Sequence, residues 1–471
     1  MTRTYIKDLR ANVGKEVTVC GWVDIRRDHG KLIFIDFRDM TGRVQTVAIP
    51  ANKEAHEAAN KVRPEWVVKA TGIVNKRPEK MISKNKETGK VEPNGDIEIE
   101  LKKLEVLNEA LTPPFDVRSD GMEINEEARL KYRYLDLRRP RMQKNIRLRS
   151  ELVDRVRQYL FKNGFTEIET PYFTSTTPEG SRDFVVPSRM YPGKFFALPQ
   201  SPQQYKQLLM TSGFEKYFQI ARCFRDEDLR ADRGFEHTQI DMELSFVTRE
   251  DVMNLDEEMM TFVLEGMGYK IKEKPFPRFT YGEAMKRFGA DKFDLRTEDD
   301  KKTGVLAFAW VIDFPFFEKD KDGKWTFTHN PFSMPALDHL KWHLAGAHTE
   351  EIITQQYDLV CDGFETGGGS IRAHKPEILK ATFRTMGYDD AKIEKDFGHM
   401  LWAFSHGTPP HGGLAHGIER LLMIMTGEKE LREVQSFPQT SSGRTAVMDA
   451  PSDISDEQLK ELGIELRKSK K

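Results

Sequence analysis

The sequence predicts a small all-β domain at the N-terminus, followed by a larger α+β domain. Three observations support this division. Residues 1–107 contain short runs of β-branched and aromatic residues, separated by glycine or charged turns. Residues 108–128 contain a Pro pair and many acidic residues, which is typical of a hinge. In residues 129–471, strand-like segments often follow one another directly, so we expect a mainly antiparallel sheet flanked by helices.

Five strands are predicted in the first domain, and one apolar-patterned helix is expected over residues 55–62. The expected strands cover residues 17–23, 32–37, 44–49, 66–74 and 97–106. Five strands with one helix inserted before the fourth are the inventory of an OB-fold barrel. We therefore predict an OB-fold β-barrel over residues 1–107.

The second domain begins with a long predicted helix over residues 141–163, which stops at Asn163-Gly164, a helix C-cap signal. The other expected helices cover residues 202–211, 249–267, 374–386 and 391–403. The expected strands cover residues 165–173, 194–199, 216–225, 235–248, 306–317, 354–364 and 413–418. The polar stretch 297–304 is predicted to be a short loop.

The composition is that of a globular protein. The 471 residues are 38% hydrophobic and 31% charged, and the formal net charge of −2 argues against a protein that coats nucleic acid non-specifically. The three cysteines show no CxxC spacing, so a disulfide framework or a cysteine-built zinc site is not expected. The N-terminus lacks the apolar core of a signal peptide, and the most apolar run, 305–317, is too short to span a bilayer. We therefore expect a cytoplasmic protein with no membrane partner.

Three segments of the second domain carry residues that suit one charged ligand. Residues 164–171 join the long helix to a strand that ends at Pro171. Residues 218–243 form two predicted strands whose polar residues recur at i, i+2 spacing, so within each strand they project from one face. These polar residues are Arg225, Glu227, Gln239, Asp241 and Glu243. A solvated hairpin would give the same pattern, but a charged sheet face is costly unless it binds a charged group. Residues 412–422 are a glycine-rich strand that runs into a helix, which suits an anion.

Taken together, these segments resemble the three signature motifs of class II aminoacyl-tRNA synthetases, in the order of that family and behind an OB-fold domain. The segments 179–183 (EGSRD), 200–206 (QSPQQYK) and 365–372 (ETGGGSIR) are similar to aspartyl-tRNA synthetases of the bacterial type. The resemblance covers nearly the whole chain and makes residues 129–471 a class II catalytic domain. It implies an aspartate–tRNA ligase that uses ATP and Mg²⁺ to activate L-aspartate and charges tRNA-Asp.

Two other classes of protein share these motifs or this fold. Asparaginyl- and lysyl-tRNA synthetases share the fold and motifs, but two cations, Arg372 and Lys206, would ill suit an amide or an ammonium substrate. A non-catalytic RNA-binding paralogue would also keep the fold. Such relatives often lose a motif arginine or a metal carboxylate, and the residues at these positions are intact: Arg225, Arg420, Asp358 and Glu365.

For ATP, the resemblance implies that Arg225 holds the α-phosphate and Arg420 clamps the γ-phosphate, both stabilising charge in catalysis. Asp358 and Glu365 would coordinate Mg²⁺, whose preference for oxygen suits paired carboxylates, although the number of ions stays open. Glu365 thereby also belongs to the ATP site.

At the adenine end, Glu227 would accept a hydrogen bond from the adenine amino group. His237 occupies the place where a phenylalanine usually stacks on adenine, and Phe235 could share that role. Two further departures concern Asn330, which replaces a usual second histidine, and residues 294–305, which directly bridge the place of a large insertion domain.

For aspartate, the resemblance implies that Arg372 and Lys206 bind the side-chain carboxylate, while Asp241 and Gln203 accept hydrogen bonds from the ammonium group. The other residues implied for this pocket are Glu179, Ser201, Gln239 and His329. The loop 179–183 resembles a mobile lid over the amino acid.

In the barrel, the resemblance implies binding of the anticodon loop, whose splayed bases are read by stacking and by hydrogen bonds. The implied residues are Arg27, His29, Phe34, Gln45, Arg77 and Lys80. From its strand position alone, Phe34 would more often be a core residue. His29 resembles enzymes that also charge tRNA-Asn, whereas Lys80 resembles those restricted to tRNA-Asp, so the sequence leaves the choice open. The helix 141–163 and Pro171 would form a homodimer interface.

Overall fold

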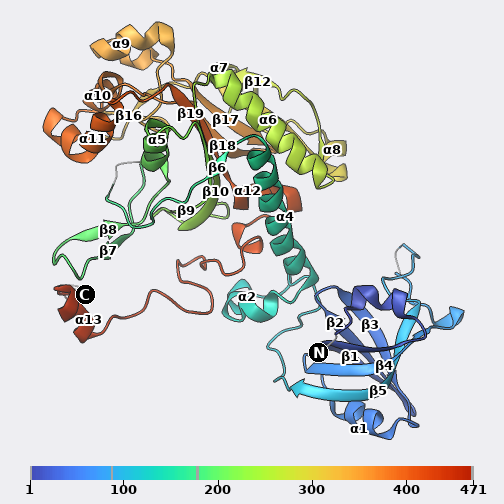
Figure 1. Ribbon diagram of the computed structural model, residues 1–471. Helices are drawn as coiled ribbons and strands as arrows, with labels where there is room; N and C mark the ends of the chain where they lie inside the picture. The colour runs from blue at the N-terminus through green and yellow to red at the C-terminus, as the bar shows by residue number, and fades with distance from the viewer. Residues whose placement is uncertain (1–2, 86–87, 177–179, 468–471) are drawn as a thin grey trace. The chain divides into compact units, whose positions relative to one another are not determined.

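The computed structural model describes residues 3–85, 88–176 and 180–467. The chain divides into two compact units, Met1–Ser119 and Asp120–Lys471, each with its own hydrophobic core (Figure 1). The division falls within the segment 108–128, which the composition indicates as a hinge.

The first unit is a closed five-stranded barrel with the strand order β1-β2-β3-β5-β4. Its strands are β1 (Glu16–His29), β2 (Leu32–Asp39), β3 (Gly42–Ala48), β4 (Val67–Lys76) and β5 (Ile97–Asn108), with helix α1 (Lys53–Lys61) between β3 and β4 along the chain. Burial alternates along β2, where Ile33, Ile35 and Phe37 are buried in the barrel core. The predicted OB-fold barrel is confirmed, although β1 and β5 are longer than expected.

The second unit is built on an eight-stranded sheet with the order β12-β14-β17-β18-β19-β10-β9-β6. Its strands are β6 (Thr166–Glu167), β9 (Lys216–Phe224), β10 (Glu236–Ser245), β12 (Arg278–Thr280), β14 (Phe308–Ile312), β17 (Gln356–Cys361), β18 (Phe364–Ile371) and β19 (His411–Gly417). The inner pairs are antiparallel, whereas the two edge pairs, β12–β14 and β6–β9, are parallel. The predicted α+β fold with a mainly antiparallel sheet is confirmed, with mixed pairing at the edges. Short ladders outside this sheet pair β7 (Val185–Pro187) with β8 (Phe195–Ala197), β11 (Lys270–Ile271) with β13 (Val305–Leu306), and β15 (Phe317–Lys319) with β16 (Trp325–Phe327).

Three helices, α4 (Pro140–Lys162), α6 (Arg249–Gly266) and α12 (Ile418–Thr426), pack on one face of the sheet (Figure 1). Alternation along β10 directs Ile240, Met242 and Leu244 into the core on that face, and leaves the intervening polar residues on the opposite face. The other helices are α2 (Glu126–Lys131), α3 (Arg133–Asp136), α5 (Gln203–Thr211), α7 (Tyr281–Phe288), α8 (Glu298–Thr303), α9 (Leu340–Ala345), α10 (Pro376–Thr385), α11 (Asp390–Phe404) and α13 (Asp456–Leu462). Among the described residues, no helix combines the length and the apolar character that a membrane crossing needs.

Two predicted strands are broken in the structure. The segment 354–364 is a hairpin, because the chain turns at Asp362 and Gly363, both with positive φ, and returns as β18. The segment 306–317 is interrupted after β14 at Asp313, which also has positive φ. The Asp362-Gly363 pair is itself a hairpin signal, which the apolar residues on either side of it concealed. At Asp313 a non-glycine turn residue leaves little signal. The segment 165–173 pairs only over β6.

The segment 297–304, predicted to be a loop, forms the short helix α8. Thr297 is its N-cap, Asp300 completes a capping box, and Gly304 ends the helix in the left-handed conformation. These start and stop signals are present in the sequence. The polar composition conceals the helix because no residue of α8 is buried.

A buried ion network ties α2 and α3 to the segment that follows α12. Asp136 is fully buried and accepts hydrogen bonds from Arg129 Nε (2.9 Å), Arg133 Nη1 (2.7 Å) and Arg139 Nε (2.6 Å). Arg129 also forms a two-point pair with Glu433, at 2.9 and 2.8 Å. One carboxylate therefore serves three buried guanidinium groups.

We expect Asp136→Ala to lower the free energy of unfolding by about 3–5 kcal/mol or more, because it leaves buried positive charge uncompensated. Chemical denaturation followed by circular dichroism would measure the loss. The control is Asp390→Ala, which removes an exposed partner of Arg384 and should have little effect. Equal losses in both variants would show that the buried network does not dominate stability here.

Candidate active site

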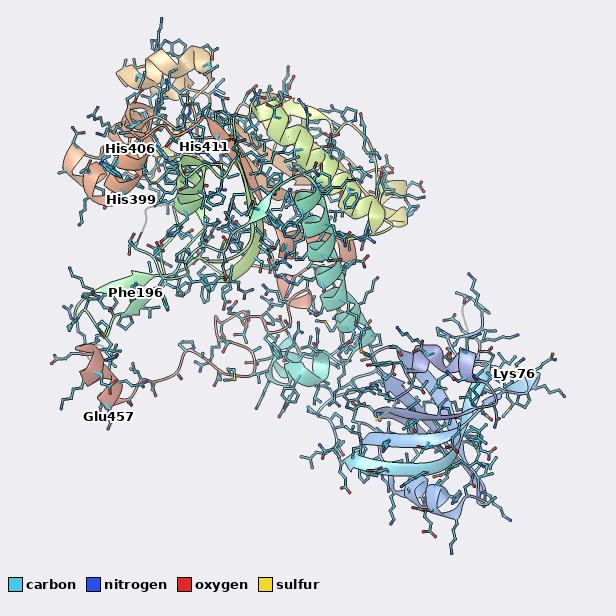
Figure 2. The ribbon with its side chains drawn as sticks, viewed as in Figure 1. Lys76, Phe196, His399, His406, His411 and Glu457 are labelled. Atoms are coloured by element: carbon cyan, nitrogen blue, oxygen red, sulfur yellow. The ribbon has the colours of Figure 1, made fainter. Side chains whose placement is uncertain are left out.

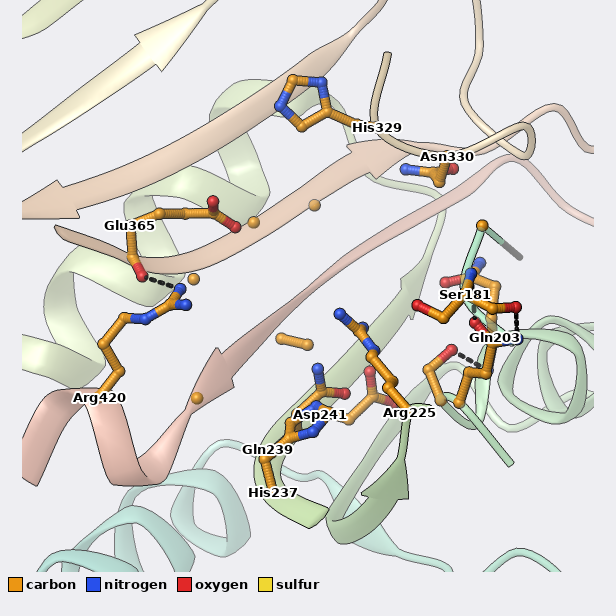
Figure 3. Close-up of a pocket in the computed structure, with 18 of the residues that line it drawn as sticks. Ser181, Gln203, Arg225, His237, Gln239, Asp241, His329, Asn330, Glu365 and Arg420 are labelled. Atoms are coloured by element: carbon orange, nitrogen blue, oxygen red, sulfur yellow. Dashed lines mark hydrogen bonds between the residues drawn. The ribbon is translucent and has the colours of Figure 1, made fainter. Parts of the chain in front are cut away.

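A cavity of about 560 Å³ opens on the sheet face opposite α4, α6 and α12 (Figure 3). Most of the predicted site residues line it: Ser201, Gln203, Lys206, Arg225, Glu227, His237, Gln239, Asp241, His329, Glu365, Arg372 and Arg420. They come from α5, β10, β18, the start of α12 and the loops around them, so segments far apart in the chain meet here. Asp358 lies on the neighbouring β17, and Glu179 falls outside the described residues.

A cluster of four buried charges lies at one end of the cavity. Lys206 Nζ lies 2.6 Å from Asp241 Oδ1 and 3.1 Å from Glu243 Oε2. Arg372 donates two hydrogen bonds to Glu243, from Nε at 2.9 Å and from Nη2 at 3.1 Å. All four side chains are at most 3% exposed. Two cations and two carboxylates thus form one linked network.

The two carboxyl groups of this network differ in character. Burial acts to raise the pKa of Glu243, but Arg372 and Lys206 outweigh it and lower this pKa to about 2. For Asp241, burial raises the pKa, and Lys206 offsets this only in part. Asp241 Oδ2 is buried without a hydrogen-bond partner among the described residues. Glu243 is therefore a fixed anion that holds the cations, whereas Asp241 has an acceptor to spare for a ligand.

The glycines of β18 and β19 make room for carboxylates from neighbouring strands. A Cβ atom on Gly413 would lie 2.2 Å from Glu243 Oε2, and one on Gly368 would lie 2.7 Å from Asp358 Oδ1. A larger residue would displace these acids, and at Gly413 it would also meet the backbone oxygen of Met242 at 2.0 Å.

Three further cations, Arg225, Arg420 and Lys292, line the cavity. The side chain of Arg225 forms no hydrogen bond or ion pair within the described chain, and its Nε is buried. Arg420 donates from Nη1 to the backbone oxygen of Glu365 (2.7 Å) and from Nη2 to Asp232 (3.2 Å) (Figure 3). Lys292 Nζ lies 2.9 Å from Glu365 Oε2. Unsatisfied guanidinium donors around an open space suit a phosphate group.

Two carboxylates in this region could hold a metal ion. A Cβ atom on Gly368 would contact both Asp358 Oδ1 and, at 3.5 Å, Glu365 Oε1, so the two acids face one small space. His329 Nε2 lies 3.2 Å from Asp358 Oδ2. Burial acts to lower the pKa of His329, but Asp358 outweighs it and raises this pKa. Within the described ranges no three His, Cys, Asp or Glu groups form a metal cluster, so phosphate and water oxygens would have to complete the octahedral shell that Mg²⁺ requires.

Two of the residues predicted to hold a nucleobase, His237 and Glu227, line the cavity. His237 lines the cavity, whereas Phe235 packs on Phe184 with ring centroids 5.3 Å apart and is not among the lining residues. Burial, together with Arg225 and other nearby arginines, lowers the pKa of His237 to about 3, so its ring is neutral at physiological pH. Glu227 accepts a hydrogen bond from Ser181 Oγ.

Two residues of the site were missed at the sequence level. Glu243 belongs to the i, i+2 pattern of β10, yet the resemblance implies no role for it; its alternation with Asp241 is the signal that predicts its position. Lys292 lies in the loop after α7 and has no local pattern that distinguishes it from a solvated lysine.

The predicted anticodon residues share the outer face of the barrel. Phe34 is half-buried and pairs across strands with Arg27, while its neighbours Ile33 and Ile35 face the core, so the alternative of a core Phe34 is wrong. Arg27 donates two hydrogen bonds of 2.8 Å to Asp36.

The remaining barrel residues extend this face. The rings of His29 and Phe34 meet edge to face at 5.6 Å. Gln45 donates to Glu98 at 2.9 Å, and Arg77 Nε lies 3.8 Å from the same carboxylate. Lys80 is exposed on the short 3-10 helix η2 (Glu79–Met81).

Comparison with protein families agrees with both units. The family described as tRNA synthetases class II (D, K and N) matches residues 125–441, and the OB-fold nucleic acid binding domain matches residues 17–107. The chain therefore belongs to the class II tRNA synthetases of the D, K and N group.

Within this group, the curated relatives that the chain resembles include aspartate–tRNA(Asp/Asn) ligases. The aspartate–tRNA(Asp/Asn) ligase of Rubrobacter xylanophilus is 38% identical over 584 residues, covering 98% of this chain and 96% of that protein. Because this alignment is longer than the 471 residues of the chain, the relative contains segments that have no counterpart here.

Solved structures show the same fold. Asparaginyl-tRNA synthetase from Pyrococcus horikoshii, complexed with asparaginyl-adenylate, has a TM-score of 0.74 at 24% identity, covering 93% of this chain and 98% of that one. Aspartyl tRNA synthetase from Entamoeba histolytica has a TM-score of 0.72 at 22% identity, covering 93% of this chain and 91% of that one.

Proposed function

We propose that this protein activates L-aspartate with ATP and transfers the aspartyl group to the 3′ end of tRNA-Asp. The observation that carries the proposal is that one cavity combines the buried Lys206–Arg372 pair with the Arg225 guanidinium, which has no hydrogen-bond partner among the described residues. A ligand that spans the cavity would place an anionic side chain at the Lys206–Arg372 pair and phosphates at Arg225 and Arg420.

The buried network is suited to select aspartate. Arg372 and Lys206 receive the side-chain carboxylate, while Asp241 Oδ2 and Gln203 accept hydrogen bonds from the ammonium group. An asparagine amide would turn N–H donors toward the guanidinium donors of Arg372 and leave them unpaired, which is costly in a buried site. Ser201, Gln239 and His329 line the same pocket, and Glu179 is assigned to it by family resemblance.

Adenylation requires an in-line attack of the aspartate α-carboxylate oxygen on the α-phosphorus, with pyrophosphate as the leaving group. Arg225 binds the α-phosphate and stabilises the charge that develops on it, and Arg420 orients the γ-phosphate. Asp358 and Glu365 would hold Mg²⁺, which supplies additional positive charge at the phosphates. His237 and Glu227 position the adenine. No side chain acts as a nucleophile, since positioning and electrostatic stabilisation account for the step.

In the second step, the terminal ribose hydroxyl of the tRNA attacks the carbonyl carbon of the mixed anhydride, and AMP leaves. Arg225, which stays at the α-phosphate, stabilises this leaving group as well. The new ester joins the aspartyl group to the tRNA.

Exchange of labelled pyrophosphate into ATP tests the proposed first step. The purified protein should catalyse exchange with aspartate and Mg²⁺, and neither asparagine nor lysine should replace aspartate. Exchange that depends on asparagine or lysine instead would overturn the assignment of the Arg372 end. Charging of purified tRNA-Asp and tRNA-Asn side by side would then establish the tRNA range, which His29 and Lys80 leave open.

The outer face of the barrel should contribute to the charging of tRNA and not to the activation of aspartate. We expect Phe34→Ala to lower kcat/KM for charging of tRNA by about tenfold or more, because stacking of a base on an aromatic ring contributes about 1–3 kcal/mol. Pyrophosphate exchange should be unchanged, since it requires no tRNA. Met40→Ala, at an exposed position of the same barrel, is the control. Loss of exchange in Phe34→Ala would contradict this division of labour.

The homodimer proposed through α4 and Pro171 is supported by large exposed apolar side chains next to this proline. Tyr172 is 38% exposed and Phe173 is 59% exposed, which is unusual for adjacent aromatic residues unless a partner covers them. We expect Phe173→Glu to convert the dimer to a monomer at micromolar concentration in sedimentation velocity. Trp402→Glu, at an exposed site on α11, should remain dimeric. A wild-type protein that sediments as a monomer would refute the interface.

A further inference from the structure

We propose that Gln207 and His411 are positioning residues that hold the amide of Gln203 with its oxygen toward the ammonium group of the amino acid. The inference rests on the proposed function, in which Gln203 accepts a hydrogen bond from that group. Neither Gln207 nor His411 lines the cavity. They act through a chain of hydrogen bonds behind it.

The direction of this chain follows from the atoms that meet. The ring of His411 and the amide of Gln207 are in contact through two nitrogens, Nε2 and Nε2, at 3.1 Å. An amide nitrogen can only donate, so His411 Nε2 must accept and carries no proton. The proton therefore resides on Nδ1, which lies 2.8 Å from the carbonyl oxygen of Pro409 and donates to it.

The chain of hydrogen bonds continues from Gln207 to Gln203, which lines the cavity. Because the Gln207 nitrogen points to His411, its Oε1 faces the other way and accepts a hydrogen bond from Gln203 Nε2 at 2.9 Å. Gln203 and Gln207 are four residues apart on α5, so their side chains lie on one face of the helix. With its nitrogen engaged, Gln203 has Oε1 left over, and this oxygen has no partner within the described chain. The Pro409 carbonyl thus determines, through three side chains, which end of the Gln203 amide faces the substrate.

Burial makes the arrangement stable. Gln207 and His411 are both fully buried, and burial lowers the pKa of His411 to about 4, so the ring stays neutral under physiological conditions. The groups around the ring include Glu243, Arg372 and His374. The backbone oxygen of His411 also accepts a hydrogen bond of 2.9 Å from the backbone nitrogen of Arg372. One residue therefore links the parts of the site that hold the two ends of aspartate (His411 is labelled in Figure 2).

The alternative orientation is unfavourable for the substrate. A Gln203 amide turned by half a rotation would direct N–H donors at an ammonium group, which also has only donors to offer. Without Gln207 the amide is free to adopt both orientations. Loss of a hydrogen bond to a charged group corresponds to roughly a tenfold or larger change in affinity.

The test is a double-mutant cycle on pyrophosphate exchange. We expect Gln207→Leu to raise KM for aspartate about tenfold, with KM for ATP and kcat little changed. In a Gln203→Ala background, the same change should add nothing, because the residue through which it acts is already gone. A side chain that merely supports the fold would act equally in both backgrounds, and that result would overturn the inference.

A second pair of variants keeps the test valid if Gln207→Leu fails to fold. His411→Phe preserves the ring but removes the acceptor and should raise KM for aspartate to the same extent. His411→Gln returns an acceptor near the position of Nε2 and should recover most of the affinity. Equal KM values for the two His411 variants would overturn the inference. An absence of aspartate-dependent exchange in the wild type would instead refute the proposed function itself.

Discussion

Replacing Arg225 with alanine should lower the rate of aspartate-dependent pyrophosphate exchange by about 10²–10³-fold, the usual effect of removing one donor that stabilises transition-state charge. The structure makes this residue the strongest candidate for such an effect. Its guanidinium lines the cavity and is committed to no other side chain in the described chain. Arg420, by contrast, is already held by Glu365 and Asp232.

The loss should appear in kcat rather than in aspartate binding, because Arg225 is assigned to the α-phosphate. Arg233→Ala provides a matched control: this arginine also lines the cavity, but it is 45% exposed and pairs with Glu227 at 3.2 Å. Its removal should change the rate only slightly. If Arg225→Ala raised only KM for aspartate and left kcat intact, the assignment of Arg225 to the α-phosphate would be wrong.

Glu243→Gln should lower both the stability of the protein and its affinity for aspartate, although the side chain keeps its size. The glutamine keeps the shape but removes the charge that compensates Arg372 and Lys206, and an uncompensated buried charge costs about 3–5 kcal/mol. Because Arg372 would lose its two-point partner, KM for aspartate should also rise by about 10- to 100-fold. Denaturant unfolding and exchange kinetics on one preparation would measure both effects. Glu105→Gln, at an exposed barrel site, is the control.

The lowered pKa of Glu243 should make the stability of the protein depend on pH. The pKa of Glu243 falls from 4.5 to about 2 on folding, so its contribution is fully present above pH 4.5 and is lost as the pH falls toward 2. This difference corresponds to about 3 kcal/mol. Asp241 acts in the opposite sense, because its pKa is raised in the folded state. Between pH 3 and 5, the stability of Glu243→Gln should therefore rise less with increasing pH than that of the wild type; parallel curves would contradict this account.

The sequence predicts both domains and most of the long elements because their signals are local. Helices α4, α5, α6, α10 and α11 and strands β9, β10 and β19 lie within a few residues of their expected ranges. The errors arise where the overall composition of a segment conceals a local turn or cap signal. The turn at Asp362 interrupts a continuous apolar pattern, and the exposed helix α8 is stabilised by caps rather than by packing.

The candidate site could also be predicted only in part from the sequence. Alternation along β10 places Gln239, Asp241 and Glu243 on one face without any knowledge of partners. That Glu243 is the centre of the cation cluster depends on Lys206 and Arg372, which are distant in sequence and meet it only in the folded sheet. The hydrogen-bond chain behind Gln203 is equally invisible, since a buried glutamine and histidine have many structural roles.

The glycine-rich strands restrict how this enzyme could be redesigned. Substitutions at Gly368 or Gly413 would drive a new methyl group into Asp358 or Glu243, so these two positions cannot carry a larger side chain. A library aimed at non-natural amino acids should therefore vary other lining positions, such as Ser201 on the way into α5 and Asn330 beside β17, and keep Gly368 and Gly413.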